Sequence, residues 1–161
     1  MKKALFILLS LFCTACFAQQ IKYTVGNNEW DADSLGNQRV VLSVGAKENN
    51  VAKAVIEWRR NDTHPEDKQL FVVDANSNKR IFNVKIESIT RESGTIFFQP
   101  SSGSKYYVYY LPYQIDRKSN YPNAKYLKPQ ETADPAWLRS IAETKDIPLA
   151  KVESIQAINA F

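Results

Sequence analysis

The sequence predicts an all-β domain, an antiparallel β-sandwich accompanied by a long loop and a short C-terminal helix. Two observations carry this prediction. Short segments of alternating apolar and polar residues recur between residues 37 and 113, and clusters of Asn, Asp, Ser and Gly separate them. Turns at intervals of about eight to twelve residues are typical of the strands of a sandwich or barrel.

The chain begins with an export signal, which we assign to residues 1–18. Lys2 and Lys3 precede an apolar run over residues 4–12, which is too short to stay in a bilayer as a span. Small residues then lead to Ala18, after which we expect cleavage. We therefore expect an exported protein, periplasmic or extracellular, with no stable membrane span.

Both cysteines, Cys13 and Cys16, lie in this signal. Lipidation of Cys16, giving an outer-membrane lipoprotein, is the alternative, but Cys13 stands where a lipidation signal has an aliphatic residue. Cleavage after Ala18 leaves no cysteine for a disulfide, a thiolate metal site or a nucleophile. It also lowers the formal charge from +4 to +2, and the interleaved charges argue against nucleic acid as a partner.

The chain divides into four segments. Residues 1–18 are the signal, 19–36 a leader, 37–113 the sandwich core, and 114–161 a polar loop, a short helix and the start of a following segment. Alternation predicts strands at residues 39–44, 54–60, 70–73, 81–89, 95–99 and 106–111, with a hairpin turn at 74–78.

Beyond the core, the polar segment 114–133 indicates a long loop. Asp134 followed by Pro135 predicts a helix that starts there and runs to about Thr144. Residues 152–161 are apolar and fit either a strand or a helix. Because the sequence stops within this apolar pattern, we expect the chain to be the front of a longer protein.

The sequence offers no complete catalytic constellation, so we name no catalytic residue and no cofactor. His64 lies in a charged loop without a nucleophile-elbow motif to pair with it, which favours a solvated turn. Asp62, Glu66 and Asp67 in the same loop lack the spacing of a calcium site. We expect these acids to form ion pairs with Arg59 and Arg60, and we predict no metal.

The tyrosine-rich segment Tyr106–Tyr110 is the sharpest local feature. In a strand, Tyr107 and Tyr109 face one way and residues 106, 108 and 110 the other. An exposed aromatic row could stack against sugar rings, whereas two buried sets would pack in the core and against a neighbouring domain. The candidate carbohydrate-binding residues are Trp58, Tyr107, Tyr109, Tyr113 and Tyr121.

Several spaced motifs together resemble one known family. They are Trp58-Arg59-Arg60 with Asp62 and Pro65-Glu66, Val72-Val73-Asp74-Ala75 with Lys79-Arg80, Tyr106 to Tyr113, Ser119-Asn120-Tyr121-Pro122 and Ala133 to Leu138. In this order they resemble the N-terminal domain of family 123-type glycoside hydrolases, which are common in gut and marine Bacteroidetes. The resemblance covers about residues 37–161.

The resemblance implies a β-sandwich placed before a (β/α)8 catalytic barrel. It further implies exo-type release of N-acetylgalactosamine by a substrate-assisted mechanism, carried by an adjacent Asp-Glu pair on the barrel. This chain has no Asp-Glu dipeptide, so no catalytic residue is transferred to it.

Three hypotheses follow from the sequence. The first is a non-catalytic accessory domain whose partner is a barrel in a longer parent chain. The second is a stand-alone carbohydrate-binding module that binds glycans through exposed tyrosines. The third is a small enzyme that uses His64 or the acids of its loop.

Overall fold

The computed structural model describes residues 21–26, 30–45, 50–116 and 123–159, and it confirms the all-β prediction. The signal at residues 1–18, with Cys13 and Cys16, lies outside the described residues. The strands are β1 (Lys22–Val25), β2 (Gln38–Ser43), β3 (Ala52–Glu57), β4 (Phe71–Asp74), β5 (Arg80–Ile81), β6 (Val84–Ile89), β7 (Ser93–Phe98), β8 (Lys105–Tyr109), β9 (Tyr113–Asp116), β10 (Asn123–Tyr126) and β11 (Leu149–Ala157). The helices are α1 (Ala32–Leu35), the single 3-10 turn η1 (Pro65–Asp67) and α2 (Pro135–Glu143).

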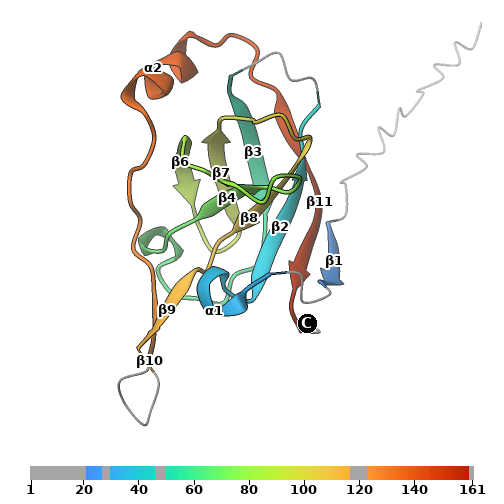
Figure 1. Ribbon diagram of the computed structural model, residues 1–161, viewed down its shortest axis with the longest axis vertical. Coiled ribbons are helices and arrows are strands. Elements are labelled where there is room, and N and C mark those ends of the chain that lie inside the picture. Colours follow the sequence, from blue (N-terminus) through green and yellow to red (C-terminus); the bar gives the residue numbers. More distant parts are fainter. Residues whose placement is uncertain (1–20, 27–29, 46–49, 117–122, 160–161) are drawn as a thin grey trace, which may run out of the picture.

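Hydrogen bonds connect most strands in the order β5-β4-β8-β2-β11-β3-β7-β6, with β1 added on β11. This path folds into two facing layers (Figure 1): a larger layer of β5, β4, β8, β2, β11 and β1, and a smaller layer of β3, β7 and β6. Most pairs are antiparallel, as predicted, but β11 runs parallel to both β1 and β3. The sequence could not show these parallel pairs because their members are far apart in the chain.

One apolar core lies between the two layers. Alternation along the strands supplies it, because every second side chain points inward. Val40 and Leu42 of β2 are buried there, as are Tyr106 and Val108 of β8. The smaller layer contributes the buried residues Ala54, Ile56, Ile96 and Phe98, with Trp58 just beyond β3. The division of residues 106–110 into two faces is therefore confirmed, because Tyr106, Val108 and Tyr110 all lie in this core.

Strand β11 is shared by the two layers. Its first residues, Leu149 and Ala150, pair with β3, and its residues 154–157 pair with β1 along the same edge. Its register with β2 shifts between Val152 and Ser154. Such a bulge bends a strand, and along this edge β11 pairs with β3 at its beginning and with β1 at its end. The segment that the sequence left open between strand and helix is thus a strand.

Helix α2 covers the outer face of the smaller layer. It begins as predicted: the carboxylate of Asp134 accepts hydrogen bonds from the backbone N–H groups of Ala136 at 2.8 Å and Trp137 at 3.0 Å. The buried side chains of Trp137 and Ile141 pack with Val51 and Phe97 in a second apolar cluster. The helix therefore closes a face that would otherwise expose β7.

Three predicted segments differ in detail from the structure. The strand predicted at 81–89 is two strands, because the chain leaves β4 after Ile81 and joins β7 in the other layer at Val84. The predicted leader contains β1 and α1, and the predicted loop contains the β9–β10 hairpin. Figure 1 shows this hairpin projecting from one end of the sandwich. The described residues of β10 are all exposed, so no apolar alternation announces that strand.

The turn chemistry predicted after β4 is confirmed. The carboxylate of Asp74 accepts hydrogen bonds from the backbone N–H groups of Asn76 at 2.8 Å and Ser77 at 3.0 Å, and from the hydroxyl of Ser101. Asn78 adopts the left-handed backbone conformation, with φ at 54°. Asp74 is itself buried, so one side chain holds both its own turn and the loop before β8.

Replacing Gly94 by Ala should destabilise the domain, because a Cβ there would lie 2.5 Å from Cζ2 of the buried Trp58 ring. We expect the free energy of unfolding to fall by about 1–3 kcal/mol, as overpacking of a closed core does. Urea unfolding of G94A measures this loss. G45A is the matched control, because a Cβ on Gly45 meets no atom within 4 Å. Equal losses in both variants would contradict the packing argument.

Candidate functional site

The outer face of the larger layer carries two arginines among aromatic rings. We define the aromatic–arginine face by six residues: Trp30, Arg39, Phe71, Arg80, Phe82 and Tyr107. Strand alternation sends Arg39, Phe71, Arg80 and Tyr107 outward, because their neighbours point into the core. The face thus runs over β5, β4, β8 and β2, which are consecutive strands.

Arg39 is 2% exposed and lies between two rings of this face. Its guanidinium carbon is 3.8 Å from the ring centre of Tyr107 and 4.2 Å from that of Trp30. Its Nε donates to Oε1 of Gln156 at 2.7 Å, and its Nη1 donates to the hydroxyl of Tyr109 at 3.3 Å. Arg39 therefore ties β2, β8 and β11 together, which makes it a structural member of the face.

Arg80 lies at the other end of the face and is held differently. Its guanidinium carbon is 3.7 Å from the ring centre of Phe71 and 5.2 Å from that of Phe82. Its Nε is buried without a hydrogen-bond partner, and no carboxylate within the described ranges pairs with it. Desolvation by burial lowers the pKa of Arg80. The ring of Phe82 beside it is 58% exposed.

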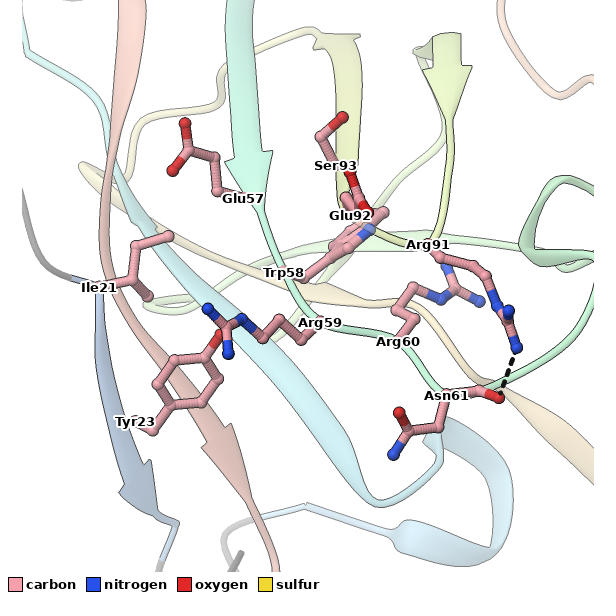
Figure 2. Close-up of a pocket in the computed structure, with 10 residues that line it drawn as sticks. All are labelled: Ile21, Tyr23, Glu57, Trp58, Arg59, Arg60, Asn61, Arg91, Glu92 and Ser93. Atoms are coloured by element: carbon pink, nitrogen blue, oxygen red, sulfur yellow. Dashed lines mark hydrogen bonds between the residues drawn. The ribbon is translucent and has the colours of Figure 1, made fainter. Parts of the chain in front are cut away.

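A second feature is the open groove between β1 and the end of β3, with a volume of about 1360 Å³. It lies where β3 and β1 pair with different parts of the same edge of β11. Ile21 and Tyr23 line one side, residues 57–61 the other, and residues 91–93 of the β6–β7 turn close one end. In Figure 2 the guanidinium of Arg59 points toward the hydroxyl end of Tyr23.

The groove is polar and its charges are nearly balanced. Glu57, Arg59 and the carboxylate of Glu92 have no side-chain partner among the described residues, whereas Arg91 donates to the backbone carbonyl of Asn61 at 3.3 Å (Figure 2). The ring of Tyr23 is 44% exposed. Planar polar groups around an exposed aromatic ring can hydrogen-bond and stack against a polar ligand such as a sugar.

Beside the groove, Asp62 holds the segment that follows β3. Arg60 donates to its carboxylate through Nε at 2.9 Å and Nη2 at 2.8 Å, and Lys68 donates through Nζ at 2.6 Å. The expected ion pair is confirmed for Arg60, but the expectation for Arg59 is wrong, because that side chain turns into the groove. Burial alone raises the pKa of Asp62, but the hydrogen bonds from Arg60 and Lys68 outweigh it and lower the pKa below its ordinary 3.8.

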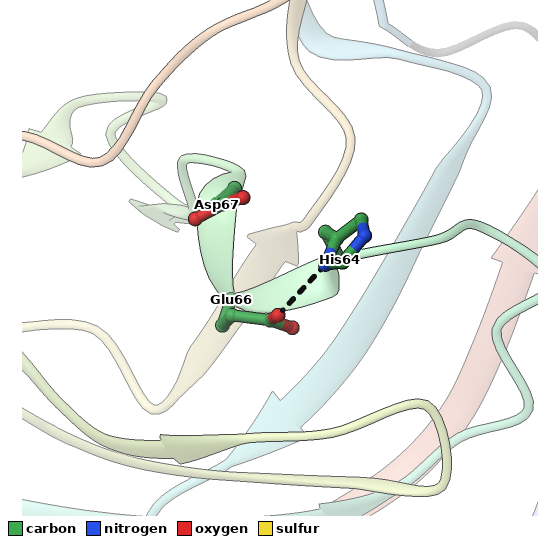
Figure 3. A group of neighbouring side chains, drawn as sticks. All are labelled: His64, Glu66 and Asp67. Atoms are coloured by element: carbon green, nitrogen blue, oxygen red, sulfur yellow. Dashed lines mark hydrogen bonds and ion pairs between the residues drawn. The ribbon is translucent and has the colours of Figure 1, made fainter.

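The loop histidine belongs to a small exposed group, drawn in Figure 3. Nδ1 of His64 lies 3.3 Å from Oε1 of Glu66, and one oxygen of Asp67 completes a set of ligand atoms within 4.8 Å of one another. All three side chains are exposed, and Asp62 belongs to the Arg60 and Lys68 pair instead. Exposed carboxylates commonly gather in this way without an ion, so the group carries no assignment.

The structure describes four of the five candidate sugar-binding residues, and of these Tyr107 and Tyr109 lie together, with ring centres 6.3 Å apart. Trp58 is 1% exposed and Tyr109 is 2% exposed, so neither offers a free ring face in this structure. Tyr107 and Tyr113 are half-buried, the latter with its ring edge-on to Tyr126 at 6.4 Å. Tyr121 lies outside the described residues. Sugar binding by these residues stays a prediction.

A family model described as glycoside hydrolase 123, N-terminal domain, matches residues 28–158. The chain belongs to this family. The resemblance seen in the spaced motifs is therefore confirmed. No curated protein and no solved structure matches the chain.

The motifs of this glycoside hydrolase 123 N-terminal domain are largely structural in the fold. Trp58 donates through Nε1 to the carbonyl of Thr90 at 2.9 Å and packs 5.1 Å from the ring of Tyr110. Arg60 and Asp62 fix the loop that follows. None of the helices in the described part of the domain is long and apolar enough to cross a membrane.

Sequence reasoning missed Trp30, Arg39, Arg80 and Tyr23. Trp30 and Tyr23 lie in the predicted leader, whose role depends on pairing with the distant β11. Arg39 is the first residue of the strand predicted at 39–44, and Arg80 directly precedes the strand predicted at 81–89, so alternation within one strand did not place either beside aromatic rings. An outward Arg beside outward aromatic residues on neighbouring strands is the signal that could have found the face.

The ion pair of Asp62 predicts how stability depends on pH. Because its pKa is lower in the folded domain than in the unfolded chain, its contribution is present above the unfolded value near 3.8 and is lost as pH falls through the folded value. Urea unfolding at a series of pH values should show this loss, and D62N should show less of it. D67N, at an exposed carboxylate of the same loop, is the control. Identical pH profiles for wild type and D62N would contradict the assignment.

Proposed function

We propose that this chain is the non-catalytic N-terminal β-sandwich of an exported glycoside hydrolase-like protein, and that it supports a catalytic domain in a longer parent chain. The match to a glycoside hydrolase N-terminal domain over residues 28–158 carries the proposal. The signal pattern of residues 1–18 supports export. The parent would degrade glycans, with N-acetylgalactosamine-containing glycans as the first substrates to test.

The placement of the charged residues agrees with a supporting role. Asp62, Asp74 and Arg39 are engaged within the fold, where they hold loops and strands. His64 and Glu66 are exposed and line an open hollow together with Ile89 and Arg91. A hydrolase needs acids positioned on both sides of a bound sugar. Among the described residues that line the groove, the acids are Glu57 and Glu92.

The isolated chain should therefore not hydrolyse glycosides, whereas the parent protein should. A chromogenic N-acetylgalactosaminide is the substrate, and release of the chromophore is the measurement. Hydrolysis by the isolated chain that disappears in His64→Ala or Glu66→Ala would instead establish the small-enzyme hypothesis. A parent reading frame without a catalytic domain beyond residue 161 would refute the supporting role.

The groove favours a second function, the binding of a glycan chain. Its half-exposed Tyr23 lies next to Arg59, with Glu57 farther along the groove (Figure 2), and neither charged side chain has a side-chain partner among the described residues. The groove thus offers an aromatic ring, a donor and an acceptor to a polar ligand. This differs from the tyrosine row considered from the sequence, because the ring available here belongs to β1.

Tyr23→Ala should weaken binding on a glycan array if the groove holds sugar. We expect the wild-type chain to bind at least one glycan and the variant to lose about tenfold or more, since one stacked ring contributes on the order of 1 kcal/mol or more. Tyr126→Ala is the matched control, because that ring is 49% exposed on β10, a strand of the projecting hairpin. A silent array with the wild-type chain would refute this second function.

A further inference from the structure

We propose that the aromatic–arginine face is the surface that docks onto the catalytic domain, and that Arg80 receives a carboxylate from that domain. The inference rests on the proposed function, because it names the surface through which support is given. Four observations on the face lead to it.

The first is the state of Arg80 in the isolated chain. A guanidinium with a buried, unpartnered Nε has lost water on that side without gaining a hydrogen bond in return. Such a loss is unfavourable unless an anion or an acceptor replaces the water. Phe71 and Phe82 hold the guanidinium in place, 3.7 Å and 5.2 Å from their ring centres. Nε itself is covered by atoms of this domain, so a carboxylate from outside would meet the two Nη groups of this half-buried side chain, which it can bind in two places.

The second observation is the composition of the surface around it. Trp, Tyr, Phe and Arg are the residue types that contribute most to protein–protein interfaces, and charged residues with long free side chains are depleted there. Here they follow one another across four neighbouring strands, with Phe82 exposed at the margin. Four of the six residues are half-buried and Phe82 is 58% exposed, so the face offers a partner side chains of the types that interfaces favour.

The third observation concerns which partner fits. A sugar stacks on the open face of an aromatic ring, but one face of Tyr107, of Trp30 and of Phe71 is occupied by a guanidinium. A protein surface that carries an acidic side chain needs no open ring face, and its carboxylate can accept hydrogen bonds from the guanidinium of Arg80. The face therefore favours an acidic protein segment over a glycan.

The fourth observation is the path of the chain. β11 is the last described strand, and its Gln156 accepts the hydrogen bond from Arg39 on this face. The backbone N–H of Ile158 then donates to the carbonyl of Asn37 at the start of β2. From β2 to β5 is three strand spacings, about 14 Å, which about five extended residues span. A domain joined after this strand would begin beside the face.

The test uses Arg80→Met in the chain and the catalytic part of the parent protein as a separate polypeptide. Methionine keeps the length and apolar contact of the side chain but removes the charge. We expect the melting temperature of the isolated chain to stay the same or rise, because an uncompensated desolvated charge is removed. We expect affinity for the catalytic part, measured by calorimetry, to fall about tenfold or more.

Matched variants separate the possible causes. Lys79→Met removes the same charge from the exposed neighbouring residue and should change neither quantity. Phe82→Ala removes the exposed ring and should weaken docking without lowering the melting temperature by more than a surface substitution does. The wild-type affinity should also decrease as salt is raised, because a carboxylate–guanidinium contact forms on docking.

Each outcome decides the matter. Docking by R80M as tight as wild type overturns the proposed face but leaves the supporting role intact. A melting temperature that falls in R80M together with docking shows that Arg80 is structural and also overturns the proposal. Glycan binding that R80M or F82A removes, with docking unchanged, assigns the face to sugar instead. If the wild-type chain does not bind the catalytic part at all, the supporting role itself fails.

Discussion

The fold depends on the position of β11 between the two layers. This strand pairs with β2 along one edge, and with β3 and then β1 along the other. Without it the smaller layer would have no hydrogen-bonded connection to the larger one, and β1 would have no partner within the described chain. The bulge at residues 152–154 makes the change of partner possible, because a bent strand can leave one layer and continue in the other. The groove lies between β1 and the end of β3, which pair with different parts of β11. Its position therefore follows from the way β11 joins the two layers.

Two kinds of arginine illustrate how the domain uses charge. Arg60 is paired with the carboxylate of Asp62 and lies over the rings of Trp58 and Tyr110, each about 5.2 Å from its guanidinium carbon. Its hydrogen bonds are made within the domain, and it serves the fold. Arg80 is stacked in a similar way, but no carboxylate of the described residues pairs with it. A buried charge that is fully paired favours one structure. A buried charge without a partner lowers the stability of the free domain, and it adds specificity to an interface when a partner binds. The contrast between these two residues connects the architecture to the proposed supporting role.

The motifs that identify the family act mainly on structure. Trp58 fills the core at the end of β3, and Gly94 on the paired strand leaves the space its ring needs. Asp74 orders a turn and a neighbouring loop through one carboxylate. These residues stabilise the strands and loops that carry the groove and the aromatic–arginine face. A domain whose characteristic residues hold its own fold together is suited to position another domain, which agrees with the proposed supporting role.

The sequence by itself determined the β class, the two faces of β8, the start of α2 at Asp134 and the family. Each of these follows from local alternation, a capping residue or spaced motifs, which a linear chain displays directly. The tertiary structure decided what depends on distant pairing: the parallel partners of β11, the switch of layers after Ile81 and the burial of Trp58 and Tyr109. It also decided that Arg39 and Arg80 share one face with aromatic rings. Local sequence shows on which side of a strand a residue lies, but only the order of strands shows which residues of other strands lie beside it.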